Sequence, residues 1–475
     1  MNQNRAPLYE ALINHSKKER YSFHVPGHKN GQTFCDLGVS HFKEILQIDA
    51  TELQGLDDLH AASGVIKDAQ ELAALLYHSK QCFFLVGGST AGNMAMIMAT
   101  CKEGDKVIVQ RNSHKSVFNA LNLAKVQPVF VEPSFDTEAQ LATTIDETEL
   151  IQTLQKHQDA KALIVTNPNY YGYTVNLEAI IKKAHQFNIA VLVDEAHGAH
   201  FGHHSTVFPK SAIEQGADIV VQSAHKTLPA MTMASYLHYN SNLVSLDQLQ
   251  YYLQLFQSSS PSYPLMASLD LARHYLANLD ERLLANYINQ INDFKQQLAS
   301  IKQIKVINNK KYIIDPLKLT IQSQCELSGY ELQQLLEKNG IFTELADRYN
   351  VLFVFSLSLQ DHLQQVYELM KSILQVYVVK PTTFSESKKN VTTSQLALSY
   401  DKMAQLDTEI VNINYSWDKI IAENIVPYPP GIPLLLTGER ITKTMLTELS
   451  QLKKAGAIFQ GDRDFFREGI KVFKY

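Results

Sequence analysis

Short runs of β-branched and aliphatic residues alternate along the chain with longer segments whose apolar positions recur at helical spacing. Strand-length apolar runs occur at Lys106–Gln110, Leu163–Thr166, Ala190–Val193 and Ile219–Val221. Helical spacing is clearest in Gly64–Lys80, where the apolar residues fall on one face. This alternation predicts βαβ units, and therefore an α/β domain with a doubly wound, mainly parallel sheet.

The pattern changes in the second half of the chain. Helical spacing prevails from Tyr239 to about Ser300, except in the polar, proline-containing stretch Ser258–Pro264. Short strands and helices then alternate over residues 305–376, which predicts a small α+β domain, and the Ser/Thr/Lys-rich residues 380–398 are typical of a linker. We therefore predict an N-terminal arm at residues 1–60, a large domain at 61–300, a small domain at 301–380 and a C-terminal domain at 381–475.

Composition narrows the class of protein. The 475 residues are 45% hydrophobic and 19% charged, as in a globular protein, and the net charge of −5 favours neither nucleic acid nor an anionic membrane as a partner. The four cysteines lack CxxC spacing, so neither a zinc site nor a disulfide framework is indicated. The first residues lack the apolar core of a signal peptide, and no apolar run has membrane-spanning length. We expect a cytoplasmic protein.

Polar residues directly follow two of the predicted strands. Asp194 comes after Ala190–Val193, and Ser223-Ala224-His225-Lys226 comes after Ile219–Val221. Ligands of open α/β sheets bind beyond the carboxyl ends of the strands, so this carboxylate and this amine are expected to converge. Singly, such an aspartate is more often a helix cap and such a lysine a solvated loop residue. Together they suit pyridoxal 5'-phosphate (PLP), whose aldehyde bonds an amine and whose pyridine nitrogen needs a carboxylate.

A glycine-rich turn offers a site for the phosphate of such a cofactor. Residues 87–93, Gly-Gly-Ser-Thr-Ala-Gly-Asn, stand between a predicted strand and a predicted helix. The free N–H groups and the dipole of a helix N-terminus attract a dianionic phosphate, and Ser89 and Thr90 add hydroxyl donors beside Ala91. Most glycine-serine turns before helices are only caps. A phosphate-binding role is favoured for this turn because a cofactor-bonding lysine is predicted in the same domain.

Five motifs occur in a fixed order: PGHKNG, TELQGLDDLH, DEAHGAH, ADIVVQSAHKTLPAMT and PYPPGIPLLLTGE. This set resembles the Orn/Lys/Arg decarboxylase family of fold-type-I PLP enzymes, in particular its short bacterial members. The resemblance extends from Pro26 to about Glu439, which is nearly the whole chain. It implies a PLP-dependent decarboxylase of a basic amino acid; arginine, which would yield agmatine and CO2, is favoured over lysine and ornithine.

The resemblance also implies roles for individual residues. Lys226 would bond the cofactor and return a proton to Cα, and Asp194 would pair with the ring nitrogen. His114 and Ala196 would cover the two ring faces, whereas His197 lies near the reaction without an assigned role. The residues implied to hold the phosphate are Ser89, Thr90, Ala91, Ser223 and His225, with Ser260 reaching the phosphate of a partner subunit.

The residues that would bind the far end of the substrate are less sharply indicated. A cationic substrate needs a carboxylate, and Glu344 matches a position near the pocket in the family. Glu439 is a second candidate, with Asp57 and Asp58 as further ones, and each is also a plausible surface carboxylate. The resemblance implies a homodimer with shared active sites and no metal, so the cluster His197, His200, His203 and His204 is not interpreted as a metal site.

Two departures from the family and two alternatives remain. Met233 stands where many members carry glutamine, and the N-terminal wing of the longer members is absent, which favours a dimer over a large ring.

An aminotransferase of the same fold would need an arginine in the small domain to hold the substrate α-carboxylate, and Arg348 is a poor match. A catalytically inactive homologue with a regulatory role is disfavoured, because Lys226, Asp194 and His114 are intact.

Overall fold

The computed structural model describes residues 2–18, 21–203, 206–380, 393–428, 431–461 and 464–474. The chain forms two compact units. Met1–Thr100 and Ala190–Leu283 make the first unit, and Cys101–Ile189 and Leu284–Tyr475 make the second. The predicted domain boundaries, which follow changes along the sequence, are a different division of the chain and stay predictions.

Four strands of the first unit form one sheet in the order β1-β10-β9-β8. They are β1 (Gln81–Leu85), β10 (Ser235–Tyr239), β9 (Ile219–Gln222) and β8 (Ala190–Asp194). β8 and β9 are parallel neighbours, as predicted, and all their residues are buried. β10 is antiparallel to both β9 and β1. The carboxyl ends of β8 and β9 therefore meet at one edge of the first unit.

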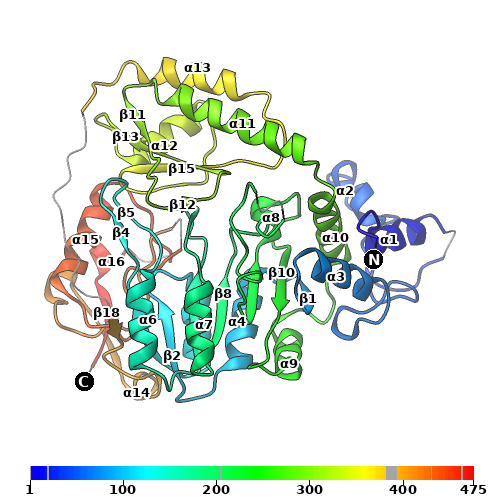
Figure 1. The fold of residues 1–475 in the computed structure, drawn as a ribbon, viewed down its shortest axis with the longest axis horizontal. Helices are drawn as coiled ribbons and strands as arrows, with labels where there is room; N and C mark the ends of the chain where they lie inside the picture. The colour runs from blue at the N-terminus through cyan, green and yellow to red at the C-terminus, as the bar shows by residue number, and fades with distance from the viewer. Residues whose placement is uncertain are drawn as a thin grey trace. The chain divides into compact units, whose positions relative to one another are not determined.

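Helices of the first unit surround these strands, and Figure 1 shows α1, α3 and α10 gathered beside β1. The helical elements are α1 (Pro7–Ser16), α2 (Val39–Leu46), the short 3-10 turn η1 (Leu59–Ala61), α3 (Val65–Leu76), α4 (Gly88–Thr100), α8 (Ala224–Thr227), α9 (Leu246–Phe256) and α10 (Tyr263–Ala277). α4 packs directly on the strands at Gly92, where an added Cβ would lie 2.7 Å from Leu85 Cδ1 and 2.9 Å from Val221 Cγ1. Glycine thus brings the helix close to the sheet, which fixes the turn that precedes it.

The second unit has its own set of parallel strands, in the order β6-β2-β3-β16. The strands are β6 (Ala162–Thr166), β2 (Lys106–Gln110), β3 (Gln127–Val131) and β16 (Thr393–Gln395). β2 is parallel to both β6 and β3, and β16 adds an antiparallel edge. Figure 1 shows α6 and α7 side by side next to these strands. The helices here are α5 (Lys115–Leu123), α6 (Glu147–Lys156) and α7 (Glu178–Gln186).

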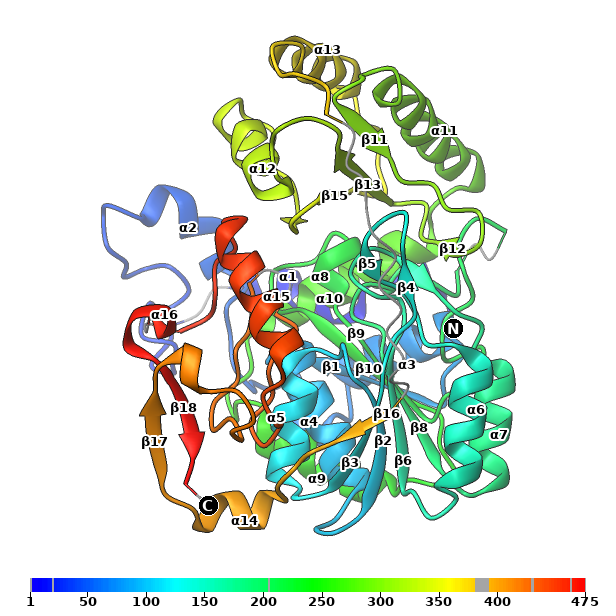
Figure 2. The same ribbon diagram turned by 90° about the vertical axis from the view of Figure 1, so that its left-hand side faces the viewer.

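A separate antiparallel sheet, β11-β13-β15-β14, forms within the predicted small domain. Its strands are β11 (Ile304–Val306), β13 (Lys318–Ser323), β14 (Leu345–Ala346) and β15 (Asn350–Val354). The helices of this part are α11 (Glu281–Leu298), α12 (Gly329–Lys338) and α13 (Leu363–Leu374), and α12 contacts the sheet (Figure 2). Short two-stranded ladders pair β4 (Phe135–Asp136) with β5 (Leu141–Ala142) and β7 (Tyr173–Thr174) with β12 (Ile313–Ile314).

The C-terminal segment has a small core of its own. β17 (Thr408–Val411) pairs with β18 (Ile470–Phe473), and the helical elements are α14 (Tyr400–Gln405), the short 3-10 turn η2 (Ile413–Tyr415), α15 (Lys443–Lys454) and α16 (Phe465–Glu468). The buried residues of this core include Ile421, Leu435, Leu449 and Val472. Across the residues that the structure describes, no helix is long and apolar enough to span a membrane. The predicted α/β class with a mainly parallel sheet is confirmed.

Candidate functional site

The carboxyl end of β8 holds a buried carboxylate. Asp194 is 2% exposed, and its two oxygens accept hydrogen bonds from different parts of the first unit. Asn93 Nδ2 donates to Oδ2 at 2.8 Å, and the Ala196 N–H donates to Oδ1 at 3.1 Å. Asn93, the last residue of the glycine turn, lies on α4, so the helix beside the sheet fixes the direction of this carboxylate.

The neighbouring strand carries the lysine to the same edge. β8 and β9 pair in register with Asp194 opposite Val221, and α8 begins just after β9. Lys226 Nζ lies 3.1 Å from His197 Nε2, and His197 is 3% exposed. The first unit thus places a lysine amine and a histidine ring together, beyond the strand that ends in Asp194.

Serine hydroxyls gather at the N-terminus of α4. Ser89 Oγ lies 2.5 Å from Ser223 Oγ and 3.3 Å from Ser235 Oγ. The helix has 13 residues, and at Gly87 an added Cβ would lie 3.0 Å from Ala91 Cβ, so the turn before it is tight. Hydroxyl donors next to free helical N–H groups form a favourable environment for a phosphate.

The other predicted phosphate residues occupy different positions around this turn. Thr90 is exposed, whereas Ala91 is buried at 5% exposure. His225 Nδ1 lies 3.1 Å from the Ala234 carbonyl oxygen, which ties α8 to the segment that leads into β10. His225 therefore has a structural contact on this nitrogen, and its predicted contact with phosphate stays a prediction.

The residues of the first unit match the chemistry of PLP. A pyridine nitrogen suits the fixed carboxylate of Asp194, an aldehyde suits the amine of Lys226, and a phosphate suits the hydroxyls of Ser89 and Ser223. All four side chains belong to one compact unit, and they come from the ends of β8, β9 and α4. The donor set that the sequence predicted is therefore assembled in a way that fits this cofactor.

Three predicted site residues lie in the second unit, namely His114, Glu344 and Glu439. His114 precedes α5, and its Nδ1 lies 2.8 Å from Ser116 Oγ. Gly431 packs beside the His114 ring, because an added Cβ there would lie 3.6 Å from ring atoms Cδ2 and Nε2. Glu344 is exposed and lines a cavity of about 320 Å³ that also includes Phe355. The predicted roles of His114 and Glu344 stay predictions.

Glu439 has a partner that the sequence did not indicate. Arg111 Nε donates to Oε1 at 2.9 Å and Arg111 Nη2 donates to Oε2 at 2.8 Å, which is a bidentate pair. Both side chains are buried, and the Leu436 N–H also donates to Oε2 at 2.9 Å. The carboxylate joins the C-terminal segment to the end of β2, and the predicted role of Glu439 in substrate binding stays a prediction.

The loop that contains Ser260 differs from its prediction in one respect. We expected it to have no apolar face to bury within its own subunit, but Pro261 and Tyr263 are buried. The Tyr263 hydroxyl donates to the Asp57 carbonyl oxygen at 2.5 Å. Ser262 caps α10, whereas Ser260 is exposed. The loop is therefore anchored at its second half, and Ser260 is exposed together with Ser258 and Ser259 before it.

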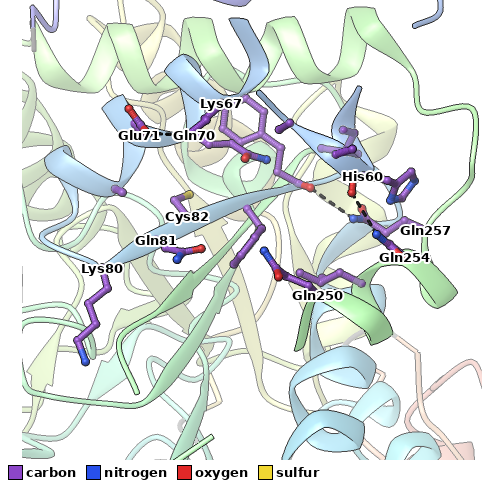
Figure 3. Close-up of a pocket in the computed structure, with 17 residues that line it drawn as sticks. His60, Lys67, Gln70, Glu71, Lys80, Gln81, Cys82, Gln250, Gln254 and Gln257 are labelled. Atoms are coloured by element: carbon purple, nitrogen blue, oxygen red, sulfur yellow. Dashed lines mark hydrogen bonds and ion pairs between the residues drawn. The ribbon is translucent and has the colours of Figure 1, made fainter. Parts of the chain in front are cut away.

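A pocket of about 540 Å³ lies elsewhere in the first unit, between α3, β1 and α9. Several glutamine side chains line it, as Figure 3 shows, and Gln254 Nε2 donates to the His60 carbonyl oxygen at 3.1 Å. Neither Lys226 nor Asp194 lines this pocket. We therefore base the candidate site on the residues at the carboxyl ends of β8 and β9.

Two alternatives concern a metal site and an aminotransferase. Within the described ranges, no group of three or more His, Cys, Asp or Glu residues could hold a metal ion, and His204 lies outside those ranges. Arg348, the candidate for an aminotransferase clamp, donates to Gln451 Oε1 at 2.8 Å. Asn93 and Ser235 were not predicted as site residues, although Asn93 ends the glycine turn predicted to bind phosphate.

Comparison with known proteins identifies the family. The model for the Orn/Lys/Arg decarboxylase major domain matches residues 6–310 and 302–362, and the model for its C-terminal domain matches residues 379–464. A Bacillus subtilis protein called uncharacterized protein YaaO is 46% identical over 475 residues, covering 98% of each chain. The arginine decarboxylase of Bacillus subtilis is 35% identical over 486 residues, covering 100% of this chain and 99% of the relative.

A solved structure supports the fold. The constitutive lysine decarboxylase of Escherichia coli has a TM-score of 0.82 and covers 99% of this chain and 82% of its own. At 19% identity this likeness bears on the fold alone. The family itself rests on the two matched models and on the relatives that align along the whole chain. The chain belongs to the Orn/Lys/Arg decarboxylase family.

Proposed function

We propose that this protein decarboxylates a basic amino acid with PLP as its cofactor, and that arginine is the preferred substrate. The observation that carries the proposal is the convergence of Lys226, Asp194 and the Ser89–Ser223 hydroxyl pair in one unit. The preference for arginine rests on the 35% identity to an arginine decarboxylase, against 21% to a lysine decarboxylase of Escherichia coli. Lysine and ornithine are the alternative substrates.

The cofactor would supply an electron sink for the bond between the substrate Cα and its carboxylate. The carboxylate of Asp194 would keep the pyridine nitrogen protonated. Its orientation is fixed by hydrogen bonds from Asn93 Nδ2 and the Ala196 N–H. Ser89 and Ser223 would bind the phosphate together with the first N–H groups of α4. These contacts would hold the two ends of the cofactor in the first unit.

Lys226 would have two tasks, to bond the cofactor between turnovers and to deliver a proton to Cα after carbon dioxide leaves. His197 Nε2, at 3.1 Å from the lysine Nζ, can exchange a proton with that amine. This contact supports a proton-exchange role for His197, to which the sequence alone assigned none. A ring nitrogen of histidine can both accept and donate a proton, which suits such an exchange.

The exposed N-terminal arm supports a homodimer with shared sites. Tyr21, Phe23 and Leu37 of this arm are 97%, 96% and 91% exposed, and exposed large apolar side chains are typical of surfaces that a partner covers. A second copy of the chain would cover this arm, and Ser260 would then face the cofactor site of the partner. The dimer is part of our proposal and is tested separately below.

The proposed reaction is tested by measuring release of CO2 from arginine, lysine and ornithine with PLP added. We expect release from arginine to exceed release from the other two, with the corresponding amine formed in equal amount. Formation of a keto acid without CO2 would indicate an aminotransferase instead. Absence of both products together with absent PLP absorbance would favour the inactive homologue.

Replacing Glu344 with glutamine tests the substrate site. If the carboxylate binds the distal cation, KM for the preferred substrate should rise about tenfold and discrimination by chain length should fall, because a charged hydrogen bond is lost. Glu337→Gln is the matched control, since Glu337 is an exposed carboxylate of α12 in the same sheet domain. Equal kinetics for both variants would assign Glu344 to the surface.

A further inference from the structure

A network of buried polar side chains crosses the first unit beneath the candidate site. Glu195, Gln222 and His238 are each 0% exposed and belong to the ends of β8 and β9 and to β10. Gln222 Nε2 donates to Glu195 Oε2 at 2.7 Å, and Gln222 Oε1 lies 3.0 Å from His238 Nε2. The network continues from His238 Nδ1 to Ser79 Oγ, which lie 3.4 Å apart.

The chemistry of the groups fixes the direction of these hydrogen bonds. An amide donates only from nitrogen, so Gln222 must accept from His238 Nε2, which therefore carries the proton of a neutral ring. Burial lowers the pKa of His238 to about 3, so the ring is neutral at physiological pH. Burial also raises the pKa of Glu195 to about 8, and the Ala212 N–H donates to its Oε1 at 2.8 Å.

The network of Glu195, Gln222 and His238 lies next to the residues proposed to bind the cofactor. Glu195 directly follows Asp194, and Gln222 directly precedes Ser223. The Glu195 N–H donates to the Val221 carbonyl oxygen at 2.9 Å, so side chain and backbone both join the two strand ends. Displacing Gln222 would therefore change the separation between the carboxylate for the ring nitrogen and the hydroxyl for the phosphate.

We propose that Glu195, Gln222 and His238 are positioning residues that hold Asp194 and Ser223 at the separation that the cofactor requires. This inference rests on the proposed PLP function and adds to it a network that touches neither cofactor nor substrate. A buried polar group costs free energy unless it is paired, so losing one member leaves its neighbours unpaired and lets the strand ends shift. The network thus couples packing in the strands to cofactor affinity.

The same strands offer a matched control at their opposite ends. Asp218 is 3% exposed and accepts from the Val191 N–H at 2.8 Å and from Ser241 Oγ at 2.5 Å. Ser241 follows β10, Val191 lies at the start of β8, and Asp218 precedes β9. Breaking this pair weakens the same strands far from the candidate site.

The test compares Gln222→Met with Ser241→Ala in the full-length protein loaded with PLP. We expect both substitutions to lower the thermal midpoint, but only Gln222→Met to weaken PLP affinity, by about tenfold for the loss of paired buried groups. Affinity and the rate of PLP loss are measured by absorbance, which does not depend on turnover. Equal PLP affinity in the two variants at matched thermal stability would overturn the positioning role.

A second comparison applies if Gln222→Met does not fold. His238→Gln places an amide nitrogen near the position of Nε2 and can donate to Gln222, whereas His238→Leu cannot. We expect PLP affinity to be retained in His238→Gln and reduced in His238→Leu, and equal affinities would again reject the inference. Wild-type protein that binds no PLP would instead refute the proposed function itself, which separates the two failures.

Discussion

Replacing Lys226 with alanine is expected to abolish turnover and the visible absorbance of covalently held PLP. The alanine leaves Asp194 and the serine hydroxyls in place, so PLP can still enter the site but has no amine to bond. Losing the amine also removes the group that returns a proton to Cα. We expect activity to fall by several orders of magnitude while the fold is kept, because Lys226 belongs to a short helix beside a rigid strand.

The control for this substitution is Lys67→Ala, which removes an exposed lysine of α3 in the same unit. This variant should keep the absorbance band and normal turnover. Borohydride reduction followed by peptide mapping identifies the lysine that carries PLP. A label on any lysine other than Lys226 would refute the central assignment.

Local sequence patterns were sufficient to predict the strands that carry the site. The apolar runs Ala190–Val193 and Ile219–Val221 correspond to β8 and β9, and their parallel pairing followed from the alternation with helices. The glycine turn likewise lies at the start of α4, as its sequence predicted. Gly92 in this turn lets the helix approach the strands closely. These features depend on neighbours in sequence, so periodicity and turn chemistry reveal them.

Contacts between distant residues were beyond that reasoning. Arg111 and Glu439 are 328 positions apart, and nothing in either local pattern marks them as partners. Asn93 and Asp194 are 101 positions apart, and the antiparallel strand β10 was not among the strands predicted from the sequence. Tertiary packing decides such pairs, and it also buries Tyr263 at the start of α10, within a stretch whose polar sequence predicted no buried face.

Activity is expected to return when two inactive variants of this protein exchange subunits. One variant is Lys226→Ala, and the other is Ser260→Trp, which places a bulky side chain on the exposed part of the loop. Ser262 is left unchanged because it caps α10. If each site combines Lys226 of one chain with Ser260 of the other, a mixed dimer has one site with both lesions and one with neither. Its activity should approach about half that of the wild-type dimer by this symmetry.

A second mixture supplies the control. Lys226 and Asp194 belong to the same unit of one chain, so mixing Lys226→Ala with Asp194→Ala leaves a lesion in both sites of every dimer. This mixture should stay inactive, whereas the mixture with Ser260→Trp recovers. Subunit exchange is verified in both cases by mass spectrometry of tagged chains. Exchange without recovery in the Ser260→Trp mixture would mean that each protomer holds a complete site, and the exposed arm would then need another explanation.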